Sequence, residues 1–125
     1  MKARDAALRL KRFELDAKVR KVEDLEQMIR EFEGMAIDLD RQIQVEEERT
    51  GIRDRNHFAY STFARSALQR RDNLSASIGD LRDKLAAAVA ERDAASSDFE
   101  DADAILQATE RRSRSSSKPT SLSQR

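Results

Sequence analysis

The side chains that could carry out chemistry are few in this 125-residue chain. One histidine, His57, and no cysteine leave no material for a catalytic triad, a thiolate nucleophile or a cysteine–histidine metal site. His57 is then most simply a solvated or locally hydrogen-bonded turn residue. Consecutive carboxylates from Glu46 to Glu48 could suggest cation binding, but a helix would spread them around its circumference. We therefore expect a protein that is not an enzyme, with no cofactor, no metal and no small-molecule ligand.

Side chains that could bind a partner are easier to find near the start of the chain. Leu10 and Phe13 would lie on the outer face of a helix, away from its packing seam, and Arg9 and Arg12 flank them. An exposed aromatic side chain bordered by arginines is typical of an interface anchor. We therefore expect these four residues to contact a partner.

A second group of candidates lies near the middle of the chain. Phe58, Tyr60 and Phe63 are three of the six aromatic residues in the sequence. They could close the end of a helical seam and pin the neighbouring loop. Alternatively, they could form a docking surface. The sequence leaves both interpretations open.

The elements that must position these residues are helical. Charged residues make up 38% of the chain, which has three glycines and one proline, so the turn residues that a β-sheet needs are missing. We expect helices at about residues 4–49 and 61–112, separated by a break at about 50–60 where turn-forming residues cluster. Residues 113–125 form a basic, serine-rich tail that lacks apolar content, and we expect this tail to be disordered.

Both predicted helices carry a seven-residue repeat. In the first, the a positions of the heptad are Leu8, Leu15, Val22, Ile29, Ala36 and Ile43. In the second, apolar residues dominate the a positions from Ala64 to Leu106 and the d positions from Ala67 to Thr109. Repeats sustained over this length are typical of a coiled coil. The predicted fold is therefore all-α, with two long helices forming an antiparallel coiled-coil hairpin over residues 1–112.

If the chain folds back near residue 55, residues of the two helices whose numbers sum to about 110 lie at the same level. This is the register that we expect for the hairpin. Each a residue of the first helix then meets a d residue of the second, and most layers pair a large side chain with alanine, as in Leu15/Ala95. Such complementary volumes allow dense packing. One layer, Lys18/Arg92, is unfavourable unless both charged groups extend outward to water.

The charges balance overall but are unevenly placed. Residues 1–22 carry a net charge of +5, residues 23–50 carry −7, and residues 111–125 carry +5. A hairpin would bring the two basic ends together. Zero net charge nevertheless argues against a general nucleic-acid binder. Since the sequence shows neither an apolar run of about 18 residues nor the apolar core of a signal peptide, we expect a cytoplasmic location.

Four stretches resemble the alphaproteobacterial branch of the FliJ family of flagellar export proteins. They are KARDAALRLKRF at residues 2–13, MAIDLDRQI at 35–43, GIRDRNHFAY at 51–60 and RRDNL at 70–74. The resemblance covers roughly residues 2–105. The stretch around the break is the most specific, because no heptad demands it. The chain departs from that branch at Arg55 and Ser61, where prolines are common.

The resemblance implies an antiparallel coiled coil similar to the central stalk of rotary ATPases. It also implies contact with the hexameric export ATPase and the membrane export gate protein, escort of export chaperones, and a peripheral location at the inner-membrane export apparatus of the flagellum. By the stalk analogy, the end that carries both termini would enter the ATPase ring. These implications connect the chain to type III secretion and motility.

Two other functions remain open from the sequence. A generic structural coiled coil would self-associate through its seam, and a parallel homodimer would have twice the 14.3 kDa mass of one chain. Nucleic-acid binding through the basic ends would instead depend steeply on salt. The number of acidic residues, equal to that of basic residues, makes nucleic acid the least expected partner.

Overall fold

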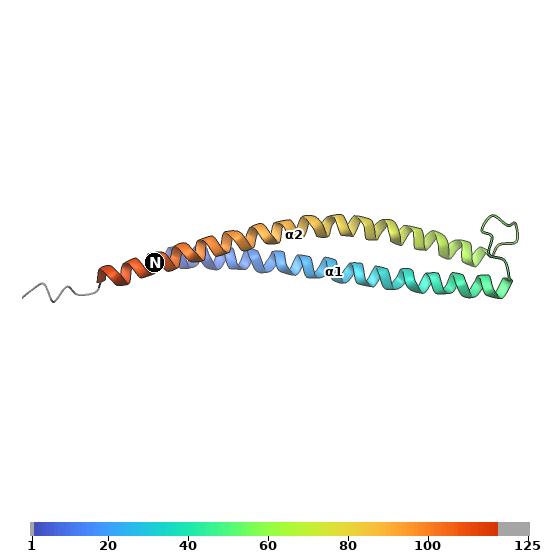
Figure 1. Cartoon of the computed structure of the whole chain (residues 1–125), viewed down its shortest axis with the longest axis horizontal. Coiled ribbons are helices and arrows are strands. Elements are labelled where there is room, and N and C mark those ends of the chain that lie inside the picture. Colours follow the sequence, from blue (N-terminus) through green and yellow to red (C-terminus); the bar gives the residue numbers. More distant parts are fainter. Residues whose placement is uncertain (1, 118–125) are drawn as a thin grey trace, which may run out of the picture. The chain divides into compact units, whose positions relative to one another are not determined.

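The computed structural model describes residues 2–117, which form two long helices. Helix α1 spans Lys2–Thr50 and helix α2 spans Thr62–Ser117. The chain reverses direction between them, so α2 packs antiparallel against α1 (Figure 1). The predicted all-α hairpin is confirmed, and no strand occurs in the part of the chain described.

Contacts divide the chain into two compact units. The tip unit is Lys21–Ala88 and contains the loop between the helices. The terminal unit combines Met1–Arg20 with Val89–Arg125. Each unit thus contains a segment of α1 paired with a segment of α2.

Local hydrogen bonds fix the helix ends on both sides of the loop. Gly51 has a φ of 73°, and its N–H donates to the carbonyl of Glu47 over 2.8 Å. This left-handed residue ends α1, as glycine commonly does just past a helix C-terminus. The Oγ of Ser61 accepts a hydrogen bond from the N–H of Ala64 over 3.2 Å, so Ser61 is the N-cap of α2.

Helix α2 runs further than the sequence predicted. It continues past Arg112 to Ser117, so the expectation of disorder was wrong for residues 113–117. An ion pair between Arg114 and Glu110, one helical turn apart, supports this last segment. Basic side chains there also interact favourably with the helix dipole. The remainder of the predicted tail, residues 118–125, lies outside the described residues.

The core of the tip unit follows the predicted register. One buried cluster contains Ile29, Ile78 and Leu81, against which Leu25, Phe32 and Leu85 pack. A second contains Leu39, Ile43 and Ala67, together with Leu68 and Leu74. The contacts Ile29/Leu81 and Ile43/Ala67 are both layers whose residue numbers sum to 110. The heptad therefore identified both the seam and its register.

A charged residue at a seam position of this unit forms ion pairs with carboxylates at the edge of the seam. Arg71 occupies an a position opposite Leu39, and its guanidinium reaches Asp40 over 3.0 Å and Asp72 over 3.4 Å. The hydrogen bond to Asp40 raises the pKa of Arg71 further above its ordinary value. A cation therefore fits into the heptad because carboxylates lie beside it.

The terminal unit has a thinner core. Leu106 is buried, whereas the seam residues Leu8, Leu15, Ala95 and Ala102 are only half-buried. The layer predicted to be unfavourable is also here. Its charged groups turn to nearby carboxylates: Lys18 Nζ lies 3.0 Å from Glu91 Oε2, and Arg92 bonds to Asp93 over 3.1 Å.

Candidate partner-binding surfaces

The terminal unit exposes the two apolar residues that the sequence singled out on α1. Leu10 is 57% exposed and Phe13 is 65% exposed. Arg9 beside them is also exposed. Both side chains are therefore accessible to a partner.

Arg12 has an additional role that sequence reasoning missed. Its guanidinium carbon lies 5.3 Å from the centroid of the Phe99 ring on α2, and its Nε lies 3.3 Å from Asp16. A cation over an aromatic face is attracted by the ring quadrupole. Arg12 thus links α1 to α2 while remaining largely exposed next to Phe13.

A small apolar groove of about 200 Å³ lies between the helices of the terminal unit. Its lining residues are Arg4, Ala7, Leu8, Ala102, Ile105 and Leu106. Ile105, an exposed residue at a g position beside the seam, was not among the residues predicted from the sequence. The signal that identified Leu10, a large apolar residue outside the a and d positions, would also have found it.

The tip loop is held by hydrogen bonds within itself and to both helices. The N–H of Asn56 donates to Asp54 Oδ1 over 3.0 Å, and the N–H of His57 donates to the carbonyl of Asp54 over 3.1 Å. On the α2 side, Arg65 donates to the carbonyl of Arg55 over 3.3 Å. The loop therefore has a defined conformation.

Tyr60 closes the seam at the tip and is not a docking residue. Only 4% of it is exposed, and its hydroxyl donates to Glu47 Oε2 over 2.7 Å. Arg65 also lies 5.6 Å from the centroid of its ring. Burial, and next the hydrogen bond to Glu47, raise the pKa of Tyr60. Of the two interpretations left open by the sequence, the capping one holds for Tyr60.

Phe58 has the opposite environment, with 96% of its surface exposed. Its ring stacks on His57, with the centroids 4.7 Å apart, and His57 Nδ1 accepts a hydrogen bond from the N–H of Ala59 over 3.0 Å. His57 is therefore a locally hydrogen-bonded turn residue, as expected. Its fixed ring holds Phe58 in an outward position, where it can contact a partner.

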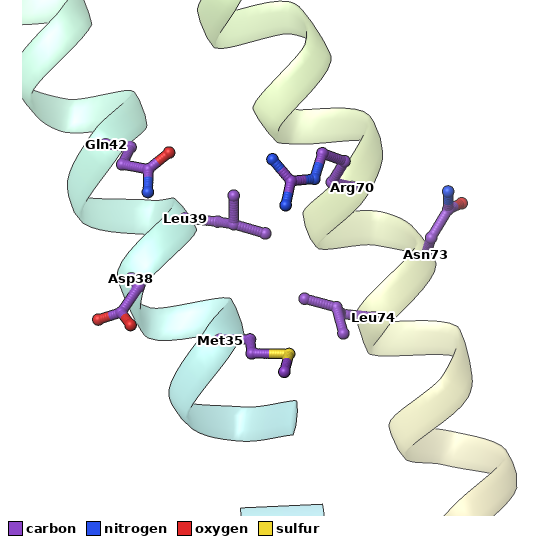
Figure 2. Close-up of a pocket in the computed structure, with 7 residues that line it drawn as sticks. All are labelled: Met35, Asp38, Leu39, Gln42, Arg70, Asn73 and Leu74. Atoms are coloured by element: carbon purple, nitrogen blue, oxygen red, sulfur yellow. The ribbon is translucent and has the colours of Figure 1, made fainter. Parts of the chain in front are cut away.

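Phe63 belongs to a different surface. It lines a groove of about 350 Å³ together with Val45, Glu46 and the α1 residues Arg41 and Gln42. Gln42 also lines a neighbouring groove of about 380 Å³. There Met35 and Leu39 of α1 and Leu74 of α2 point into the space between the helices, while Arg70 extends from α2 towards α1 (Figure 2).

The consecutive carboxylates on α1 have separate partners. Glu46 accepts hydrogen bonds from Arg49 and Ser61, which lower its pKa; Glu47 accepts from Tyr60, and Glu48 from Gln44. No group of carboxylates and histidine suited to holding a metal ion occurs among residues 2–117. Within the same range, neither helix has a stretch that is long and apolar enough to cross a bilayer.

A scan against protein-family models, a search of curated proteins and a search of solved structures each found no match for this chain. Its function is therefore inferred from the geometry of the hairpin and from the resemblance of its sequence to FliJ.

Proposed function

We propose that this chain is a non-enzymatic helical-hairpin adaptor of the flagellar type III export apparatus. It would couple the export ATPase hexamer to the membrane export gate protein and escort export chaperones. It would act in the cytoplasm, peripherally bound to the inner-membrane apparatus. The resemblance of residues 2–105 to FliJ supports the identity of these partners.

The observation that carries the proposal is the exposure of Leu10 and Phe13 among arginines in the terminal unit. Large apolar side chains at such positions have no partner within a two-helix hairpin. Burying them in a second protein would remove apolar surface from water at roughly 25 cal/mol per Å². An aromatic anchor with neighbouring arginines is the composition of residues that dominate binding energy at protein interfaces.

The charge of the terminal unit indicates the kind of surface that would receive it. Arg4, Arg9 and Arg12 lie on α1, and the last turns of α2 add Arg111 and Arg112, whereas Asp98, Asp101 and Asp103 of α2 belong to the same unit. The excess of positive charge is therefore confined to the outermost turns. These turns extend beyond the start of α1 (Figure 1). An ATPase ring that takes this end would therefore have an apolar pocket bordered by acidic residues, and electrostatic attraction would speed the encounter.

Phe58 is the second proposed contact, at the tip. Exposure of the Phe58 ring to water is unfavourable in the isolated chain. The hydrogen bond between Ala59 and His57 orders the loop on either side of this ring. We assign it to the gate or a chaperone, since the stalk analogy gives the opposite end to the ATPase.

The test is to mix the purified full chain with a cognate flagellar export ATPase and measure binding, hexamer formation and ATP hydrolysis. The chain should bind the ATPase, promote its assembly into hexamers and increase its rate of ATP hydrolysis. A Leu10→Ser/Phe13→Ser double variant should weaken binding at least tenfold, on the order expected for loss of a central anchor. The matched control is Ile37→Ser, an exposed α1 residue of the tip unit, which should bind normally. Absence of binding by the unaltered chain, or equal losses in variant and control, would refute the proposal.

A further inference from the structure

The two edges of the seam in the tip unit differ in character. We call them the e edge and the g edge, after the heptad positions that flank the a and d layers. On the e edge, Arg82 of α2 bonds to Glu33 of α1 over 3.3 Å, and Tyr60 bonds to Glu47 over 2.7 Å. Polar contacts between the two sides of the hairpin therefore cross this edge at two levels.

The g edge of the same unit carries grooves and exposed apolar side chains. Two grooves, of about 380 and 350 Å³, lie along it and share Gln42. Met28, Met35 and Phe63 occupy g positions, and Val45 occupies a neighbouring c position. All four side chains are exposed. This edge thus combines exposed apolar side chains with the polar groove residues Gln42, Arg70 and Asn73, and no part of residues 2–117 covers it.

The two rims of the g edge have opposite charge over much of their length. The rim on α1 has the acidic c-position residues Asp24, Glu31 and Asp38, with Lys21 and Arg49 at its ends. The rim on α2 has Arg70 and Lys84 at g positions and Asp80 at a c position. Asp38 also lies 3.9 Å from Arg41 within α1, an exposed pair that contributes little on its own. A partner with the same two rims, facing the other way, would complement this edge.

We infer that the g edge of the tip unit binds a second copy of this chain. A two-fold axis parallel to the helices would place α1 of each copy antiparallel to α2 of the other, forming a four-helix bundle with both tips at the same end. Residues at equal levels then meet. Val45 would pack against Phe63 of the second copy, and Asp38 would lie near Arg70 of the second copy.

The opposite orientation is disfavoured by charge. With the tips at opposite ends, α1 would lie against α1 of the second copy, and Asp24, Glu31 and Asp38 would face their equivalents. Like charges in such proximity repel. The arrangement with both tips together is therefore specific. The dimer goes beyond the proposed adaptor function, and it uses neither Leu10 nor Phe13.

Sedimentation equilibrium of the full chain tests the inference. The apparent mass should rise with concentration from 14.3 kDa to twice that value. Met35→Glu should raise the dissociation constant at least tenfold, because it buries a charge in the interface. Ile37→Glu is the matched control, since Ile37 is 52% exposed and Met35 is 51% exposed, but Ile37 lies at a b position away from the g edge. Circular dichroism would confirm that both variants remain helical.

Charge reversal and labelling test the orientation. Asp38→Arg and Arg70→Asp should each weaken the dimer, and the double variant should restore it. A spin label on an Arg53→Cys variant should give a short distance between copies, because both tips lie together. A chain that stays monomeric as concentration rises, an equal effect of Met35→Glu and Ile37→Glu, or tip labels that are far apart would each overturn the inference. Binding of a helix from another protein at this edge, without self-association, would overturn it as well.

Discussion

Tyr60 holds the tip loop onto α1, although two neighbouring aromatic residues are exposed to solvent. Its ring is buried at the end of the seam, and its hydroxyl reaches back to Glu47. Phe58 and Phe63 lack a hydroxyl and could not make this bond. The hydroxyl group therefore distinguishes Tyr60, which stabilises the loop, from Phe58 and Phe63, which are available to partners.

Tyr60 is the only tyrosine in the chain, so its ionisation can be followed directly by ultraviolet absorbance. We predict a midpoint above the value of about 10 for free tyrosine, because burial and then Glu47 both favour the neutral phenol. The fold then binds this proton more tightly than the unfolded chain does. The stabilisation is fully present below the unfolded pKa and is lost as the pH rises through the folded value.

Two substitutions separate the causes of this shift. Glu47→Gln should lower the Tyr60 midpoint only in part, because burial remains and is the larger cause. Glu48→Gln is the control and should leave it unchanged, since Glu48 bonds to Gln44. Titration of Tyr60 at the value of free tyrosine in the folded chain would contradict the capping role.

The loop residues show where sequence reasoning reaches its limit. The sequence offered two roles for Phe58, Tyr60 and Phe63 without separating them. Whether the two loop residues Phe58 and Tyr60 are buried or exposed depends on loop hydrogen bonds such as His57 Nδ1 with Ala59 and Tyr60 with Glu47, which have no periodic signature. The contact of Arg12 with Phe99 was missed for a similar reason, because a cation–π pair between helices depends on side-chain conformation.

At the scale of elements, glycines in different backbone conformations should respond oppositely to substitution. Gly51→Ala should destabilise the fold by about 1–2 kcal/mol, because an L-residue is strained at a φ of 73°. Gly34→Ala should stabilise α1 by about 1 kcal/mol, because alanine is the better helix former and a Cβ meets nothing within 4 Å. Thermal or urea unfolding would measure both. The same sign for the two variants would contradict the assigned end of α1.

The charged seam layer in the terminal unit gives a second test of the helix pairing. Lys18→Leu/Arg92→Ala converts it into a large-against-small apolar layer like its neighbours. We expect a gain of about 1 kcal/mol, because partial burial of leucine outweighs exposed ion pairs worth about 0–1 kcal/mol. Arg20→Leu, at an exposed f position of the same unit, should give no such gain. A loss of stability in the double variant would indicate another register.

Both helices and their register could be predicted because they depend on a repeated pattern. Each heptad indicates the same buried face of the helix. A single charged residue at a d position, such as Lys18, therefore does not obscure the seam. The end of α2 has no such redundancy: Ser113 to Ser117 look unstructured by composition, yet they continue an established helix. Propagating a helix is easier than nucleating one, which explains why composition was misleading there.

At the scale of the molecule, the two units should differ in local stability. The tip unit contains both buried clusters, whereas the described part of the terminal unit buries Leu106 among mostly half-buried seam residues. Amides of residues 2–20 should therefore exchange hydrogen faster than those of residues 21–50, although both belong to α1. Uniform protection along α1 would contradict this difference.

The central claim is that the chain folds back on itself so that residues whose numbers sum to about 110 are neighbours. Because the chain has no cysteine, spin labels can be placed at Glu23→Cys and Ala86→Cys, two exposed sites at nearly the same level of the tip unit. The protein would be diluted with unlabelled chain, so that the distance reports on a single molecule. Helices packed 8–10 Å apart predict a separation within about 25 Å between the labels. A single continuous helix would instead place them roughly 95 Å apart, and a distance near that value would contradict the hairpin.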